Sequence, residues 1–203
     1  QGIGLFVVPA NAAGVTVTPY TRYDGMCAGE LRLDAVRVGT DALLGEAEGG
    51  IDALERAVDL ATVAACADAV GAMAQVLHKT AAYLSTRRQF DAPLASFQVL
   101  QHRLVDMFAA LEAARSMVVM AVLHAEAAPA QRSRAASAAK AGVGERARLV
   151  AQQGVQLHGG VGMTEELDIG HYFRRLTLFQ QAFGGTDHHL QRFASLRDAA
   201  ATT

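Results

Sequence analysis

The sequence changes character near residue 48, and this change constrains the fold more than any other feature. From there on, apolar residues recur at helical spacing among alanine, leucine, glutamate and arginine, and only Pro93 and Pro129 interrupt them. This pattern predicts amphipathic helices packed as an antiparallel four-helix-type bundle. We expect helices over about 50–88, 97–127, 129–158 and 166–182, with a last one after Asp187.

The first 45 residues have the glycines, prolines and β-branched residues of strands and turns. The candidate strands are "GIGLFVVPA", "GVTVTPY" and "GELRLDAVRV", which we expect to pair in an antiparallel way. Three or four strands cannot bury both faces of a sheet unaided, so we expect an upstream segment or a partner to complete it. The predicted fold class is therefore mainly α, with a partial antiparallel β-domain over 1–45 followed by a helical domain over 46–203.

Composition excludes several classes of partner. The chain has 203 residues, of which 51% are hydrophobic, and a formal net charge of -2 with its basic residues scattered among acids. This balance argues against a nucleic-acid or anionic-membrane surface. The two cysteines, Cys27 and Cys66, lack metal-ligand spacing, and we expect no signal peptide and no apolar run long enough to span a bilayer. These features favour a reducing cytoplasm as the location.

Other motifs are weak alone. Five of the seven histidines are dispersed, and the adjacent His188 and His189 would point about 100 degrees apart on a helix, so we predict no metal site. "HGGVG" at 158–162 follows a predicted helix, where its simplest role is a C-cap with Gly159 or Gly160 in the left-handed conformation. No nucleophile elbow or paired Cys and His motif of hydrolases occurs.

The stretch "YLSTRRQFDAPLASFQ", residues 83–98, concentrates two arginines, an aromatic ring, a proline and a glutamine between two alanine-rich runs. Considered alone, Arg87 and Arg88 would cap the C-terminal end of a helix, where cations are favourable. Three segments taken together say more. In the order "RRQFDAPLASFQVLQHRLVDM", "QLHGGVGMTEE" and "HYFRRLTLFQQAFGGTDHHLQRFA", the chain resembles the C-terminal helical domain of the acyl-CoA dehydrogenase family, and residues 1–45 resemble the second half of its middle β-domain.

Within that family, the "HGG" and "GHYFRRLT" variants are most similar to small subunits of the pimeloyl-CoA dehydrogenase type, which pair with a larger subunit. The resemblance implies FAD as cofactor, an acyl-CoA substrate, and a homo- or hetero-oligomer with FAD at a subunit interface, arranged as a dimer of dimers. It also implies an electron-transfer flavoprotein as the electron acceptor.

The resemblance also assigns cofactor-binding residues. The residue that matches Arg87 binds the diphosphate of a flavin held mainly by the neighbouring protomer, which suits an arginine because its planar fork gives two charge-assisted bonds and never loses its charge. Phe90 and Gln98 match positions beside the same cofactor. One departure is Asp91, where the family usually has glycine; we expect this carboxylate to face solvent.

A second group of cofactor positions comes from later in the chain. Gln156, Gly159 and Gly160 match the segment that follows the pyrophosphate and ribose of FAD, where side chains would block backbone N–H groups from approaching. Gly185 and Thr186 are also assigned to the cofactor by the resemblance.

The family removes an α-proton with a carboxylate while a hydride leaves the β-carbon for flavin N5. Its usual base is a glutamate near the last helix, and counting from Gln156 places Phe183 in that slot, or Gly184 after a shift of one residue. Some members use an early helix instead, and that slot holds Ala61, with Glu55 and Asp59 nearby but out of register.

The nearby acids have simpler explanations. We expect Glu55 and Asp59 to lie on a solvated helix face, and Asp187 to be an N-cap.

Three functions remain open. The chain can be an FAD-contacting dehydrogenase subunit whose partner supplies the base, a structural subunit that has lost flavin and base, or a complete enzyme with Glu55 or Asp59 as a non-standard base. The retained phosphate-binding arginine favours the first over the second, and the vacant base slots disfavour the third.

Overall fold

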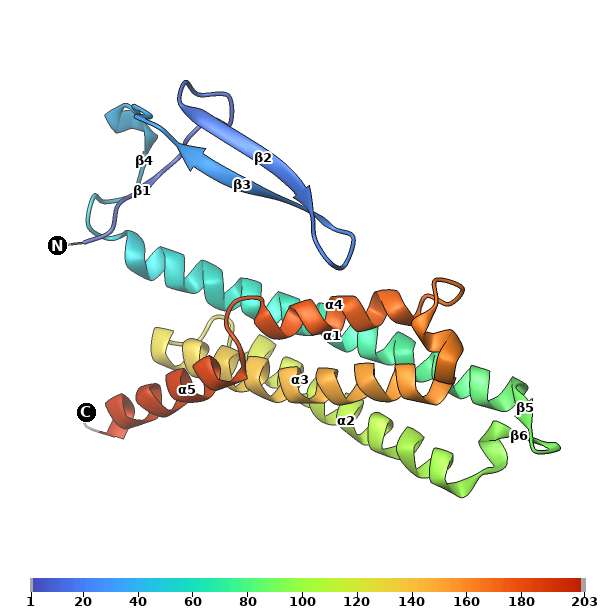
Figure 1. The fold of residues 1–203 in the computed structure, drawn as a ribbon. Coiled ribbons are helices and arrows are strands. Elements are labelled where there is room, and N and C mark those ends of the chain that lie inside the picture. Colours follow the sequence, from blue (N-terminus) through green and yellow to red (C-terminus); the bar gives the residue numbers. More distant parts are fainter. Residues whose placement is uncertain (1, 202–203) are drawn as a thin grey trace. The chain divides into compact units, whose positions relative to one another are not determined.

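The computed structural model describes residues 2–201, with side chains described to Leu196, and the chain divides into two units, Gln1–Val58 and Asp59–Thr203. The fold class predicted from the sequence is confirmed: helices dominate after a short region of antiparallel strand pairs. The boundary between the two units falls inside the first helix, between Val58 and Asp59. The change in composition had predicted a domain boundary between residues 45 and 46. Figure 1 follows the order of the elements.

The first unit contains two small antiparallel ladders. β2 (Val15–Thr21) pairs with β3 (Cys27–Leu33), with Val15 opposite Leu33 and Thr21 opposite Cys27. β1 (Leu5–Phe6) pairs with β4 (Leu43–Leu44). Four apolar side chains of the longer ladder are exposed, namely Val17, Tyr20, Leu31 and Leu33. What covers these side chains stays a prediction from the sequence.

α1 (Gly50–Thr86) begins in the first unit and continues through the second. By length and hydropathy it could cross a membrane, which corrects the expectation that no segment is long and apolar enough. Core helices of bundles pass the same test, and Cys66, Met73 and Leu84 of α1 are fully buried in the helical unit.

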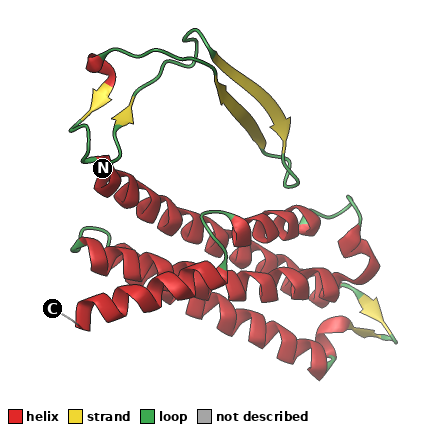
Figure 2. Cartoon of the chain, turned by 60° about the vertical axis from the view of Figure 1, so that its left-hand side comes forward, coloured by secondary structure: helices red, strands yellow, loops and turns green. Residues whose placement is uncertain are grey.

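The helices of the second unit pack around α3 (Pro129–His158), which contacts α2 (Gln98–Leu123), α4 (Ile169–Gln181) and α5 (Thr186–Ala201). Most buried residues of α3 are small, so neighbouring backbones can approach closely. A side chain at Gly154, for example, would place its Cβ 2.4 Å from Cγ1 of Val76 on α1. In Figure 2 the helices of this unit run alongside one another.

Two helices end where the backbone turns sharply, α1 two residues before its expected limit and α3 at its expected limit. α1 stops at Thr86 because the chain turns there into a small hairpin, β5 (Arg88–Gln89) and β6 (Ala92–Pro93), before the short 3-10 turn Leu94–Ser96. α3 stops at His158 because Gly159 adopts a left-handed φ of 66°, and the 3-10 segment Gly159–Met163 follows. Both breaks lie in motifs that the sequence singled out.

Candidate functional site

The hairpin after α1 is a tight turn at an unusual pair of residues. Arg88 lies opposite Pro93 and Gln89 opposite Ala92, which leaves Phe90 and Asp91 as a two-residue loop. Both loop residues have positive φ, 52° for Phe90 and 63° for Asp91. Two-residue hairpin loops with positive φ at both positions favour asparagine, aspartate or glycine, and a bulky aromatic residue there is strained. Asp91 therefore suits its position in the loop, whereas Phe90 does not.

The two arginines of the hairpin do different things. The Nη2 atom of Arg88 donates a hydrogen bond to the backbone oxygen of Asp91 at 2.9 Å and so closes the loop. Arg87 lines a pocket, and its guanidinium has no hydrogen-bond or ion-pair partner among the described residues. Neither arginine is helical, because α1 ends at Thr86, two residues before the limit of about residue 88 expected from the sequence.

That pocket, which we call the Arg87 pocket, has a volume of about 460 Å³. It lies where the end of α1, the hairpin, the start of α2 and the end of α3 meet. Its lining residues are Tyr83, Arg87, Gln89, Leu94, Leu100, Gln156, Leu157, His158, Gly159, Gly160 and Val161. Four of the eight predicted cofactor residues therefore come together, from segments about 70 residues apart in the sequence.

Two lining residues of the Arg87 pocket, Tyr83 and His158, contact each other. The rings of Tyr83 and His158 stack with centroids 4.5 Å apart, and Nδ1 of His158 donates to the backbone oxygen of Gly154 at 2.8 Å. The hydroxyl of Tyr83 donates to the backbone oxygen of His158 at 3.4 Å. The Tyr83–His158 contacts join the end of α1, next to Arg87, to the end of α3, which carries Gln156.

The glycines at the mouth of the pocket are open to an incoming group. A Cβ added at Gly159 or Gly160 would meet nothing of this chain within 4 Å. Gly159 needs its left-handed φ, but Gly160 has neither a positive φ nor a close neighbour that requires glycine. No contact within the chain therefore requires glycine at this position. The side chain of Gln156 is exposed in the same pocket and also lacks a hydrogen-bond partner among the described residues.

Phe90 and Gln98 do not line the Arg87 pocket. Phe90 is 84% exposed at the hairpin tip, where its ring meets that of Phe97 edge to face at 6.1 Å. Gln98 is the exposed first residue of α2. Sequence reasoning missed Tyr83, Gln89 and His158 as lining residues, although all three stand inside the quoted motifs.

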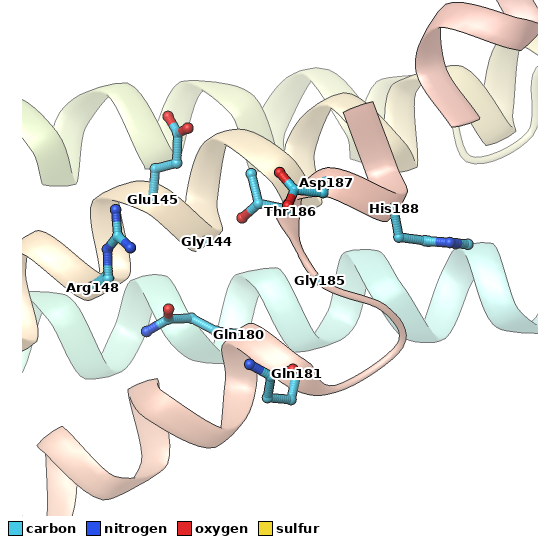
Figure 3. Close-up of a pocket in the computed structure, with 9 residues that line it drawn as sticks. All are labelled: Gly144, Glu145, Arg148, Gln180, Gln181, Gly185, Thr186, Asp187 and His188. Atoms are coloured by element: carbon cyan, nitrogen blue, oxygen red, sulfur yellow. The ribbon is translucent and has the colours of Figure 1, made fainter. Parts of the chain in front are cut away.

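Gly185 and Thr186 lie in a separate pocket of about 370 Å³ (Figure 3). Around it are residues of α3, of the end of α4 and of the start of α5, namely Gly144, Glu145, Arg148, Gln180, Gln181, Gly185, Thr186, Asp187 and His188. Gly144 precedes Gln156 by 12 residues on α3, which is about 18 Å along a helix axis. The eight predicted cofactor residues thus do not form one site.

The two pockets differ in charge. The lining of the Arg87 pocket carries an arginine and no carboxylate, whereas Glu145 and Asp187 accompany Arg148 in the other. Asp187 lies in the first turn of α5, one residue inside the helix rather than before it as the N-cap interpretation required. A carboxylate there is favourable to the helix dipole. Of the two, the Arg87 pocket is the better place for a diphosphate.

The loop between α4 and α5 contains the slot where the family's base would be. Phe183 has φ 58° and is 48% exposed, and Gly184 has φ 101°. The backbone oxygens of this loop are tied down by two buried side chains: Nζ of Lys140 donates to Gln180 at 3.3 Å and to Gly184 at 2.9 Å, and Nε2 of His189 donates to Phe183 at 2.9 Å. The loop is well held but offers no proton acceptor at the slot.

Lys140 reaches the loop from inside the core. Its side chain is 1% exposed, its ammonium lies 4.5 Å from the ring centroid of Phe179, and burial lowers its pKa. The neighbouring thiol of Cys66 is no counter-ion, because burial raises its pKa to about 12. The buried charge is therefore stabilised by backbone carbonyls and an aromatic face.

Asp59 is not on a solvated face, so that expectation was wrong. It is fully buried, and its carboxylate accepts hydrogen bonds from Arg132 at 3.2 Å, Ser133 at 2.6 Å and Arg192 at 2.7 Å. This cluster joins α1, α3 and α5. A carboxylate with both oxygens occupied by cations and a hydroxyl is poorly suited to accept a substrate proton. Glu55 is exposed, as expected.

Among the residues that the structure describes, no group of three or more His, Cys, Asp and Glu side chains could hold a metal ion.

Comparison with known proteins places this geometry in context. Residues 48–195 match the family described as acyl-CoA dehydrogenase, C-terminal domain. The chain is 31% identical over 199 residues to the probable acyl-CoA dehydrogenase YngJ of Bacillus subtilis, covering 96% of this chain and 51% of YngJ. It therefore spans about half the length of the curated relatives that cover nearly all of it.

Two solved structures have a fold similar to that of this chain. The Tcur3481-Tcur3483 steroid ACAD G363A variant has a TM-score of 0.88 and 35% identity, and the match covers 98% of this chain and 53% of that one. The ChsE4-ChsE5 complex from Mycobacterium tuberculosis has a TM-score of 0.83 and 28% identity, covering 97% and 52%.

Proposed function

The chain belongs to the acyl-CoA dehydrogenase family, and we propose on that premise that it binds FAD within an enzyme that dehydrogenates acyl-CoA thioesters between the α- and β-carbons. The observation that supports this most is the Arg87 pocket. An unpaired guanidinium, an unpaired amide and a glycine with no internal reason to be glycine converge there.

The residues present fit the diphosphate of FAD. Arg87 would give charge-assisted hydrogen bonds to phosphate oxygens, and its charge persists at any physiological pH. The backbone at Gly159 and Gly160 can approach an anion closely, because no Cβ stands in the way. Leu94 and Leu100 close the apolar side of the pocket and would exclude water from the adjoining part of the cofactor.

The bound flavin would accept the hydride from the substrate β-carbon. The chain's own contribution at the reacting end is a fixed loop: Lys140 and His189 hold the backbone from Gln180 to Gly184, which sets the position of Phe183. Phe183 can pack against an acyl chain or a ring, but a phenyl group cannot take the α-proton. A carboxylate from a partner subunit would supply that step.

The comparison structures support a two-component assembly. Both the steroid ACAD and the ChsE4-ChsE5 complex carry two component names. We therefore extend the proposal to a heteromer with FAD at the subunit interface, arranged as a dimer of dimers, and to a bulky acyl group as substrate. Electrons would leave through an electron-transfer flavoprotein.

Two alternatives are less well supported. A purely structural subunit has no need for an unpaired arginine facing a glycine-lined pocket. A complete enzyme with Asp59 as base conflicts with the buried ion cluster that occupies both oxygens of Asp59. Glu55 is exposed and lies outside this cluster, so the same argument does not apply to Glu55 as the base.

The visible absorption spectrum of the purified native assembly tests the proposal. We expect flavin bands, with at most one FAD per heterodimer. An assembly that lacks flavin and also fails to take up added FAD would contradict the proposal and support the alternative of a purely structural subunit.

A further inference from the structure

A groove runs along α3 between α2 and α5, both of which pack on α3. It consists of two hollows of about 260 Å³ each, and we call it the α3 groove. The two hollows adjoin, because Ala138 and Phe193 line both. On α3 the apolar lining residues are small, whereas on α2 and α5 they are long. The main apolar lining residues are Met117, Met120, Ala138, Gly142, Leu190 and Phe193.

One end of the α3 groove carries a cation without a counter-ion. The guanidinium of Arg134 lies over the ring of Phe193, 4.7 Å from its centroid, and has no hydrogen-bond or ion-pair partner among the residues that the structure describes. No carboxylate lines this end, where the polar neighbours are Gln131 and His124. The ring covers one face of the guanidinium, so the N–H groups at its edge are left for an incoming acceptor.

The opposite end of the α3 groove is apolar except for one exposed carboxylate, that of Glu145. In Figure 3 this carboxylate points away from Gln180 and Gln181. A negative group here disfavours a second anion, so an anionic ligand would place its charge at Arg134. Gly142 follows Arg134 by eight residues on α3, which is about 12 Å along the helix axis. The groove therefore suits a chain-like apolar ligand with one charged end.

The chemistry of the lining identifies the ligand class. Small-molecule sites are mostly apolar, with a few polar groups that fix the orientation of the ligand. An arginine without a counter-ion matches the planar fork of a carboxylate, because two parallel charge-assisted bonds can form. We propose that the α3 groove binds the anion of a linear fatty acid. The carboxylate pairs with Arg134, and the hydrocarbon chain lies over Ala138 and Gly142, between Met117 and Leu190.

This site is separate from the Arg87 pocket. Ala138 precedes Gln156 by 18 residues on α3, which is about 27 Å along the helix axis. Fatty acid binding in the α3 groove needs no flavin, so the two assignments can fail separately. One link between them rests on the proposed function: hydrolysis of an acyl-CoA thioester releases a fatty acid anion, so the ligand is related to the proposed substrate.

Calorimetric titration of the purified native assembly with decanoate tests the site. We expect saturable binding that Arg134→Gln weakens on the order of 10- to 100-fold, because the substitution removes a charge-assisted pair. Arg115→Gln is the matched control. Arg115 is 51% exposed, pairs with Glu112 on α2 and lines neither hollow, so its substitution should leave the affinity for decanoate unchanged.

A second variant tests the path of the hydrocarbon chain. Ala138→Leu adds its side chain where the two hollows adjoin, and it should abolish decanoate binding while the thermal unfolding of the protein alone stays cooperative. Affinity should also rise with chain length from hexanoate to decanoate, by about two- to fourfold per methylene. Equal affinities for the two acids would show that the apolar part of the groove holds no chain.

The neutral analogue 1-decanol separates recognition of the carboxylate from apolar binding. It should bind more weakly than decanoate, and Arg134→Gln should not change its affinity, because the lost contact is specific to the charged head. Decanol that binds as tightly as decanoate would overturn the assignment of the head group to Arg134.

Two further results would overturn the proposal. Decanoate that binds equally well to the wild type, Arg134→Gln and Ala138→Leu would lie elsewhere. No saturable binding to the native assembly would mean that the groove is not a fatty acid site, as would be the case if a partner chain covers it. The flavin spectrum of the same samples reports independently on the proposed function.

Discussion

The Nζ atom of Lys140 donates a hydrogen bond of 2.9 Å to the backbone oxygen of Gly184, 44 residues later in the sequence. A second bond from the same ammonium reaches Gln180 at 3.3 Å. A buried cation from α3 thus fixes both ends of the loop that contains Phe183. This loop holds Phe183 in a left-handed conformation that a phenylalanine does not adopt readily.

Lys140→Met should lower the free energy of unfolding by about 1 to 3 kcal/mol, because it keeps the apolar stem and leaves two carbonyls without their donor. Lys79→Met is the matched control: Lys79 pairs with Asp168 at the surface, where such a pair contributes about 1 kcal/mol or less. Denaturant unfolding measures both. If the two variants lose the same small amount, Lys140 does not hold the loop.

Arg87→Ala should weaken FAD binding by about 2 to 3 kcal/mol, on the order of 30- to 150-fold, because it removes charge-assisted bonds to the diphosphate. Arg88→Ala should cost less, since Arg88 bonds the backbone of Asp91 and lines no part of the pocket. Equilibrium release of FAD from the purified assemblies compares them. Equal affinities would show that the diphosphate lies elsewhere.

Asp59→Asn should destabilise the helical unit by about 3 kcal/mol or more, because it leaves the buried Arg132 and the partly buried Arg192 beside a neutral group. Glu55→Gln should stay within about 0.5 kcal/mol, as for other exposed positions. Thermal and chemical unfolding give the comparison. If Asp59→Asn left the free energy of unfolding unchanged, the buried cluster would contribute little to stability.

His189 should make the protein less stable in mild acid. Burial lowers its pKa from 6.5, and the positive charges of Lys140, His188 and Arg192 act in the same direction against the bond to Phe183. Between that lowered pKa and 6.5 the unfolded chain binds a proton that the folded chain does not. Stability therefore falls as the pH falls through this window and levels off below the folded-state pKa.

Denaturant unfolding at pH 7.5 and 5.5 checks this dependence. His189→Gln should reduce the loss of stability between the two pH values, because the titrating group is gone, whereas His78→Gln at an exposed position should keep the wild-type loss. An unchanged loss in His189→Gln would assign the acid sensitivity to other groups.

Local pattern predicted most of the fold. The alanine-rich periodicity gave the helices, and α3 was placed at its observed limits, Pro129 to His158, because a first-turn proline and a following glycine mark its ends. The hairpin at Phe90 and Asp91 was missed because Asp91 suits a positive φ but Phe90, the first residue of the loop, does not.

Features that depend on distant residues could not be predicted. Asp59 was assigned to a solvated face because its buried partners come from residues 132, 133 and 192. The division of the predicted cofactor residues into two pockets has the same cause. A motif shows which residues to expect, but it does not show where they lie in the folded chain. Arg87, Gln156, Gly159 and Gly160 were brought together by the packing of α1 on α3, which no single motif encodes.

The most direct test of the central claim is anaerobic mixing of the FAD-loaded protein with acyl-CoA thioesters, followed by the flavin absorption band. This chain without its partner should hold flavin that does not bleach, because Phe183 cannot take the α-proton and a positioned base contributes on the order of 100-fold to 10,000-fold. Adding the partner subunit should restore bleaching at no more than one site per heterodimer. Bleaching by this chain alone, abolished by Glu55→Gln, would contradict the account and identify Glu55 as the base.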